Sequence, residues 1–124
     1  MLLNDFYSFE KVHHIDGKVE ATITFQPNHA IFAGHFPGQP VVPGVCLVQA
    51  VKDLLSIAIV QKLALEKAAN IKFLAVIIPN QLPGIALQIN YQTLLHQVEV
   101  QATLHQEAKV CFKMNATFGM RTSA

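Results

Sequence analysis

Hydrophobic and polar residues alternate along four stretches of the chain, and residues that favour turns bound each stretch. Such period-two alternation predicts β-strands with one buried face. The four stretches are residues 19–26, 85–92, 97–104 and 110–118. An Asp16-Gly17 dipeptide before the first of them favours a tight hairpin back to an earlier strand at residues 6–15. Short connections between the last three predict an antiparallel meander.

Residues 45–66 contain no glycine or proline and predict one helix, which would be about 30 Å long. Pro43 and Gly44 stand just before it, as at many helix starts. Polar residues are few and form one short stripe, so we expect this helix to be buried nearly all round. The stripe consists of Gln49, Lys52, Asp53 and Ser56. Residues 71–78, which are almost continuously apolar, predict a further strand.

The predicted order is two strands, one long helix and four more strands. The simplest packing is a single antiparallel sheet curled around a central helix, which is an α+β fold. No internal repeat or low-complexity segment divides the chain, so we expect residues 1–124 to form a single domain.

The amino-acid composition shows that charged residues are scarce. Of the 124 residues, 52% are hydrophobic and 14% are charged, and the formal net charge is +1. An average domain has roughly 25% charged residues, so part of this surface is expected to be hidden in an oligomer or a ligand tunnel. The near-equal numbers of basic and acidic residues predict no nucleic-acid partner and no attraction to an anionic membrane.

A membrane span is the competing explanation for the apolar excess, because residues 73–95 carry no charge. Proline, glycine, asparagine and glutamine interrupt this stretch, and its second half alternates like a strand, so we predict no span. Residues 1–10 lack the pattern of a signal peptide, and we therefore expect a cytoplasmic protein.

Cysteine and histidine spacing argues against a disulfide scaffold and against a metal site. The two cysteines, Cys46 and Cys111, lie within apolar patterns and are predicted to be buried free thiols. The six histidines show no i, i+4 spacing and no accompanying acidic cluster, so no metal is expected.

The segment most suited to chemistry is residues 28–49, where prolines and glycines surround His35 just before the predicted helix. The first amides of a helix have no intrahelical partner and lie at the positive end of its dipole. A basic imidazole held beside such amides suits proton abstraction next to a thioester carbonyl, whose oxygen then becomes an enolate.

The run from residue 35 to residue 45, His-Phe-Pro-Gly-Gln-Pro-Val-Val-Pro-Gly-Val, resembles the active-site motif of the β-hydroxyacyl-acyl-carrier-protein dehydratases of fatty acid synthesis. Residues 28–32 and 71–73 also match the family's pattern, so the resemblance covers most of the chain. It implies the hot-dog fold, in which a curved antiparallel sheet wraps one long central helix.

The same resemblance implies roles for individual residues. His35 would remove the proton from C2 of a 3-hydroxyacyl thioester, and the amide of Gly44 would bind the thioester carbonyl. The other substrate-binding residues that it implies are Phe36, Gly38, Pro43 and Val45.

One position departs from the family's pattern. Fourteen positions after His35, where the family has a glutamate or aspartate that helps to expel the C3 hydroxyl, this chain has Gln49. An amide can orient a hydroxyl but has no acidic proton near neutral pH. Asp53, one helical turn further along, is the candidate substitute acid, acting directly or through a water. The alternative is that Asp53 pairs with a neighbouring lysine or faces a dimer partner.

The resemblance favours a dehydratase-like lyase of fatty acid or related lipid or polyene synthesis. Its substrate would be carried on the phosphopantetheine of acyl carrier protein or on coenzyme A, with no other cofactor. The alternatives are an acyl thioesterase and a non-catalytic thioester-binding subunit. A homodimer or higher homo-oligomer is expected, and a related catalytic subunit is a further candidate partner.

Overall fold

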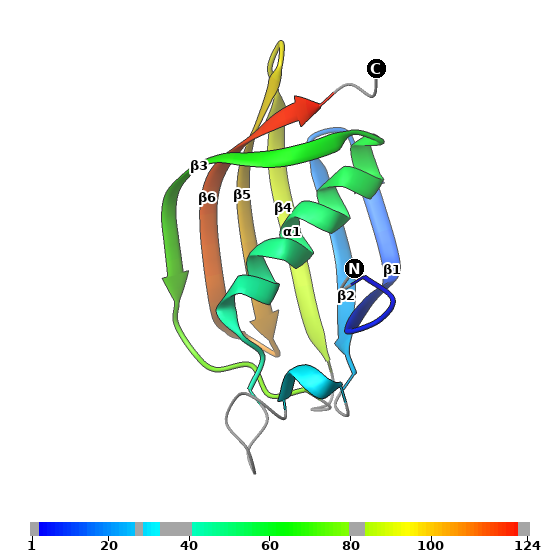
Figure 1. Cartoon of the computed structure of the whole chain (residues 1–124), viewed down its shortest axis with the longest axis vertical. Helices are drawn as coiled ribbons and strands as arrows, with labels where there is room; N and C mark the ends of the chain where they lie inside the picture. The colour runs from blue at the N-terminus through cyan, green and yellow to red at the C-terminus, as the bar shows by residue number, and fades with distance from the viewer. Residues whose placement is uncertain (1–2, 27–28, 33–40, 80–83, 122–124) are drawn as a thin grey trace.

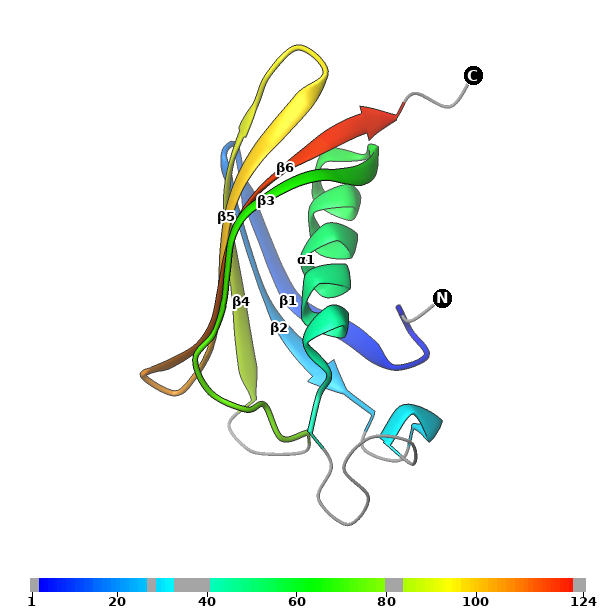
Figure 2. The same ribbon diagram turned by 60° about the vertical axis from the view of Figure 1, so that its left-hand side comes forward.

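The computed structural model describes residues 3–26, 29–32, 41–79 and 84–121. In chain order its elements are β1 (Tyr7–Ile15), β2 (Lys18–Phe25), η1 (Ala30–Phe32), α1 (Gly44–Ile59), β3 (Lys62–Phe73), β4 (Ile85–Thr93), β5 (Gln97–Gln106) and β6 (Lys109–Arg121). The strands form one six-stranded antiparallel sheet in the order β1-β2-β4-β5-β6-β3. The sheet curves around α1, as the hot-dog architecture requires (Figures 1 and 2).

The strands predicted from alternation are confirmed. Tyr7 pairs with Phe25 at one end of the first hairpin and Ile15 pairs with Lys18 at the other, so Asp16 and Gly17 form a two-residue turn. Gly17 has a φ of 87°, a left-handed conformation that glycine adopts without steric cost. The meander of β4, β5 and β6 is also as predicted.

The predicted helix over residues 45–66 and the predicted strand over residues 71–78 are both found, but with different bounds. The helix ends at Ile59, because Val60 adopts a left-handed conformation and its N–H bonds to the carbonyl of Ser56. The chain then enters β3, which pairs along its length with β6 and ends at Phe73. Alanine, leucine, glutamate and lysine in this segment favour a helix locally, but pairing with β6 overrides that propensity.

The core lies between the concave face of the sheet and one side of α1. The buried residues of α1 include Leu47, Ala50, Val51, Leu54 and Leu55. Burying a leucine side chain stabilises the fold by about 1.5–3 kcal/mol, so these residues fix the position of the helix on the sheet.

Burial of the helix nearly all round is not found within one chain. Val45 is 75% exposed and Ile57 is 52% exposed, because the sheet covers only one side of α1 (Figure 2). The prediction of buried free thiols is confirmed for Cys46 and Cys111. No helix in the described part of the chain has the length and apolar character needed to cross a membrane.

Candidate active site

The first turn of α1 presents backbone amides that the preceding side chain does not cap. Pro43 precedes the helix in an extended conformation and makes no side-chain hydrogen bond to it. The N–H of Val42 donates to the carbonyl of Ile77 over 2.9 Å, and this bond ties the helix start to the segment after β3. The amides at Gly44 and Val45 therefore lie at the positive end of the helix dipole on a fixed backbone.

An aromatic ring lies close to Gly44. A Cβ atom at this position would lie 2.6 Å from Cε1 of Phe73, which is the last residue of β3. Phe73 in turn contacts Phe112 of β6, with ring centroids 5.4 Å apart. The absence of a side chain on Gly44 thus leaves room for the Phe73 ring against the start of α1.

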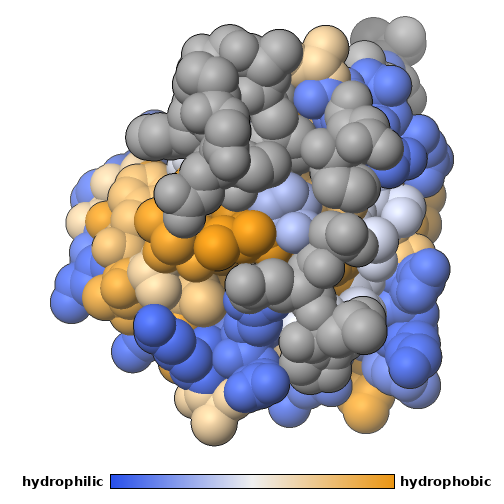
Figure 3. Space-filling model, turned by 90° about the horizontal axis from the view of Figure 1, so that it is seen from below, coloured by the Kyte–Doolittle hydropathy of each residue, from blue (hydrophilic) through white to orange (hydrophobic). Residues whose placement is uncertain are grey.

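Three of the predicted substrate-binding residues, Pro43, Gly44 and Val45, lie together at this end of the molecule. Seen from below, an orange apolar area borders the grey residues there (Figure 3). Exposed apolar side chains at the end of β3 and just after it are Phe73, Leu74 and Val76. An acyl chain has the apolar character needed to cover such a surface.

Further along α1, Gln49 and Asp53 form a buried polar cluster with Tyr7. Nε2 of Gln49 donates to Oδ1 of Asp53 over 3.0 Å. The hydroxyl of Tyr7 donates to Oδ2 of the same carboxylate. Asp53 is 9% exposed, and among the described residues it is the one buried charged side chain. In the described part of the chain, the partners of the Asp53 carboxylate are thus Tyr7 and Gln49 rather than the lysine considered as an alternative.

Tyr7 keeps its proton in this environment. Burial raises its pKa far above the ordinary value, and the hydrogen bond to Asp53 and the negative charge of Asp53 raise it further. A phenol that stays protonated is a permanent hydrogen-bond donor to Asp53.

Cys46, in the first turn of α1, is suited to the core rather than to nucleophilic catalysis. It is 1% exposed. Burial raises the pKa of its thiol, so the reactive thiolate is disfavoured.

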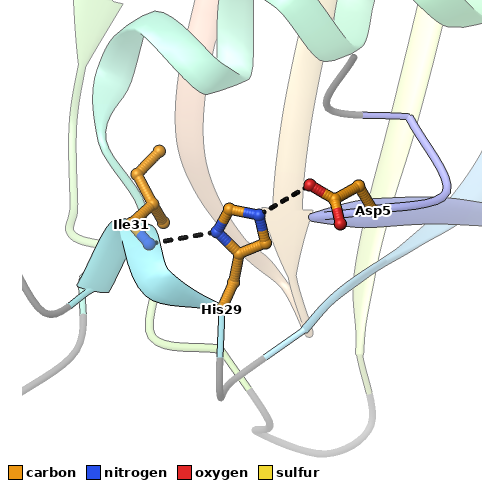
Figure 4. Close-up of polar contacts among 3 residues, drawn as sticks. All are labelled: Asp5, His29 and Ile31. Carbon is orange, nitrogen blue, oxygen red and sulfur yellow. Dashed lines mark hydrogen bonds and ion pairs between the residues drawn. The ribbon is translucent and has the colours of Figure 1, made fainter.

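A second polar contact precedes the segment that carries His35. Nδ1 of His29 accepts the N–H of Ile31 over 3.0 Å, and its Nε2 lies 2.9 Å from Oδ2 of Asp5 (Figure 4). Because Nδ1 accepts, Nε2 carries the ring proton and donates it to the carboxylate. His29 thereby links η1 to the N-terminal segment that also carries Tyr7.

His35, Phe36 and Gly38 lie outside the described residues, so their predicted roles stay predictions. Gln49 and Asp53 are brought together as their i, i+4 spacing implies. The contacts of Tyr7 with Asp53 and of Asp5 with His29 were not predicted. The available signal for Tyr7 was Asp53 itself, because a carboxylate on an apolar helix needs a donor from another element. In the described part of the chain, no three histidine, cysteine, aspartate or glutamate side chains gather to hold a metal ion.

Comparison with protein families matches residues 11–115 to the ApeI-like model, described as ApeI dehydratase. The chain is 30% identical over 114 residues to the 3-hydroxyacyl-[acyl-carrier-protein] dehydratase FabZ of Zymomonas mobilis, covering 86% of this chain and 65% of that protein. It is 32% identical over 74 residues to the protein of the same name from Clostridium acetobutylicum, covering 54% of this chain and 51% of that protein. The chain thus spans about half to two thirds of the length of these relatives.

Solved structures with a similar fold include the dehydratase heterocomplex ApeI:P from Xenorhabdus doucetiae. The TM-score is 0.70 at 18% identity, over 90% of this chain and 96% of that chain. A thioesterase from Haemophilus influenzae gives a TM-score of 0.64 at 14% identity, over 94% of this chain and 78% of that chain. These likenesses confirm the hot-dog fold.

Proposed function

The chain belongs to the ApeI-like dehydratase family, and on that premise we propose that it eliminates water from a 3-hydroxyacyl thioester to give a trans-2-enoyl thioester. The observation that carries the proposal is the start of α1 at Gly44, where amides without a side-chain cap directly follow the segment containing His35. The family relatives are named for acyl-carrier-protein substrates. We therefore propose a phosphopantetheine-linked substrate, in fatty acid or related lipid or polyene synthesis.

In the proposed reaction, His35 takes the proton from C2 and the electron pair moves toward the thioester carbonyl. The amides at the start of α1 stabilise the negative charge on that oxygen. The C3–O bond then breaks as the double bond forms. Gln49 has no acidic proton, so we propose that the imidazolium formed at His35 returns its proton to the leaving hydroxyl, which departs as water.

Gln49 would bind the hydroxyl rather than protonate it. Because its Nε2 is engaged by Asp53, its carbonyl oxygen is the end that can accept a hydrogen bond from the substrate. Asp53 uses one oxygen for Gln49 and the other for Tyr7, which supports a holding role. The rival role, Asp53 as the substitute acid, is separated from it by Asp53→Asn. Loss of an acid would lower turnover by at least about a hundredfold, as we expect for His35→Ala, whereas loss of a holding group would lower it about tenfold.

The activity is tested by hydration of a trans-2-enoyl thioester, which is the same reaction in reverse. We expect His35→Ala to lower the rate by at least about a hundredfold. The matched control is His14→Ala, which changes a histidine on β1 that we assign no role in the reaction. If wild type and His35→Ala show the same background rate, the protein is not this lyase.

Restoring the family's acid gives a second test. Gln49→Glu alone would place a second carboxylate against Asp53, and like charges this close disfavour each other. We therefore expect the double variant Gln49→Glu/Asp53→Asn to exceed the wild-type rate, and Gln49→Glu alone to gain less. Release of free thiol without an alkene product would instead support a thioesterase, and binding without turnover would support a non-catalytic subunit.

We propose that two subunits associate through β3. This strand lies at one end of the sheet and pairs with β6, which leaves its other edge available. The partner would be a second copy of this chain or a related catalytic subunit. The structurally similar ApeI:P dehydratase is an example of a heterocomplex. Light scattering after gel filtration tests this proposal, and a monomer at all accessible concentrations would contradict a homo-oligomer.

A further inference from the structure

The carboxylate of Asp53 is an expensive group to bury on an otherwise apolar helix. An ionised side chain removed from water destabilises the fold unless protein donors replace the lost hydration. Two donors do so, the hydroxyl of Tyr7 from β1 and the amide of Gln49 from α1. Of these, Gln49 is half-buried and Tyr7 is buried.

Tyr7 is fixed by the segment around it. It is 2% exposed, and its neighbour Phe6 is fully buried. The ring of Tyr7 contacts the rings of Phe6, Phe9 and Phe25 at centroid distances of 6.1, 5.8 and 6.0 Å. The carbonyl of Phe6 accepts the N–H of Gln26 over 2.7 Å, which continues the pairing of β1 with β2. The phenol hydroxyl therefore has little freedom to move away from Asp53.

This fixed donor holds the carboxylate of Asp53 in place, and the carboxylate in turn fixes the Gln49 amide. A carboxylate that accepts from Tyr7 through Oδ2 offers Oδ1 as a second acceptor, and only the NH₂ end of an amide can donate to it. The carbonyl oxygen of Gln49 must then point elsewhere. Without the Tyr7 hydroxyl, Asp53 can rotate, Oδ1 is no longer held within reach of Nε2 of Gln49, and the amide loses the contact that fixes it.

We propose that Tyr7 is a positioning residue that acts through Asp53 to hold the carbonyl oxygen of Gln49 toward the substrate's C3 hydroxyl. The inference rests on the proposed function for its catalytic consequence. The orientation of the Gln49 amide, in contrast, can be measured in the protein without substrate.

The catalytic test compares Tyr7→Phe with Tyr91→Phe, since each removes one tyrosine hydroxyl that shares a hydrogen bond with a distant side chain. Tyr7→Phe is expected to lower kcat about tenfold with KM within about twofold, because the substrate still binds but its hydroxyl is misoriented. Tyr91→Phe should change neither constant. In a Gln49→Ala background, Tyr7→Phe should cause no further loss of kcat. An equal loss in both backgrounds, or an unchanged kcat in Tyr7→Phe, would overturn the proposal.

A second measurement does not depend on turnover. In an amide NMR spectrum, the Nε2 protons of Gln49, identified by their loss in Gln49→Ala, should shift and exchange faster in Tyr7→Phe than in Tyr91→Phe. Dispersed signals elsewhere show that the variant is folded. If wild type has no lyase activity but these protons respond, the proposed function fails and the orienting role of Tyr7 stands. If they do not respond, the orienting role fails whatever the activity.

Discussion

The two tyrosines of the chain each share a hydrogen bond with a side chain far away in the sequence, but the two pairs lie in different surroundings. Tyr7 donates to Asp53 in the buried space between β1 and α1. Tyr91 shares a hydrogen bond of 2.5 Å with Nε2 of His14, between β4 and β1, where water has access. Similar chemistry thus occurs once inside the core and once at its border. The difference shows what burial does to a tyrosine hydroxyl: water cannot replace Tyr7 as the donor to Asp53, whereas it can replace Tyr91 as the partner of His14.

The largest contrast between the two pairs should come from removing each tyrosine side chain. Tyr7→Ala leaves a core cavity and is expected to lower the free energy of unfolding by about 3–5 kcal/mol. Tyr91→Ala, at a half-buried position, should lower it by about 1 kcal/mol. Urea denaturation monitored by circular dichroism gives both values, and equal losses would show that burial does not separate the two sites.

Removing only the hydroxyls sharpens the comparison, because the rings stay in place. Tyr7→Phe leaves the buried carboxylate of Asp53 with one donor fewer, which should cost about 1–3 kcal/mol. Tyr91→Phe should cost less than about 0.5 kcal/mol, since water can replace the hydroxyl as a partner of His14. The same denaturation curves test this, and a larger loss in Tyr91→Phe would reverse the interpretation.

Alkaline pH should destabilise the protein through Tyr7. Its pKa in the fold lies above the ordinary value of 10.0 because of burial and Asp53. Above about pH 10 the unfolded chain releases the phenol proton while the folded chain keeps it, so stability falls as pH rises, by up to about 1.4 kcal/mol per pH unit. Below about pH 10 this contribution is fully present.

Melting temperatures from about pH 8 to about pH 11 provide the measurement. The variant Tyr91→Phe is the matched background, because the chain has no tryptophan and Tyr7 then gives the whole tyrosinate absorbance. Adding Tyr7→Phe should make the alkaline fall in stability shallower. A tyrosinate signal that develops near pH 10 in the folded protein would contradict the buried donor.

The smallest effect is expected at the Asp5–His29 pair, which is also polar but more exposed than Tyr7 and Asp53. The side chain of Asp5 is 69% exposed. Asp5→Asn keeps an oxygen that can accept from Nε2 of His29, so we expect a change in unfolding free energy within about 0.5 kcal/mol. Thermal denaturation tests this, and a loss as large as that of Tyr7→Phe would place Asp5 with the buried cluster.

The sequence predicted the strands well where one face is buried. β2, β4, β5 and β6 alternate cleanly because each has a core side and a water side. β3 gave no such signal, because most of its residues are exposed. The end of the helix at Val60 could not be predicted either. A β-branched residue rarely takes the left-handed conformation, and no glycine marks the boundary.

Within the candidate site, sequence spacing predicted the contact between Gln49 and Asp53 but not the partner behind it. Residues four apart on a helix face each other whatever the rest of the chain does. Tyr7 reaches Asp53 only because β1 lies beside α1, and that position depends on the packing of the whole sheet. Contacts within one element were therefore accessible from the sequence, and contacts between elements were not.

The strand order of the sheet also constrains how the molecule can assemble itself. β3 pairs with β6, from Lys62 opposite Arg121 to Phe73 opposite Phe112, although β4 and β5 lie between them in the chain. β3 therefore cannot pair with its neighbour in the sheet until β6 has been synthesised. Pairings this distant in sequence slow folding, and until they form, the unpaired edge of β3 and the apolar side of α1 are open to aggregation.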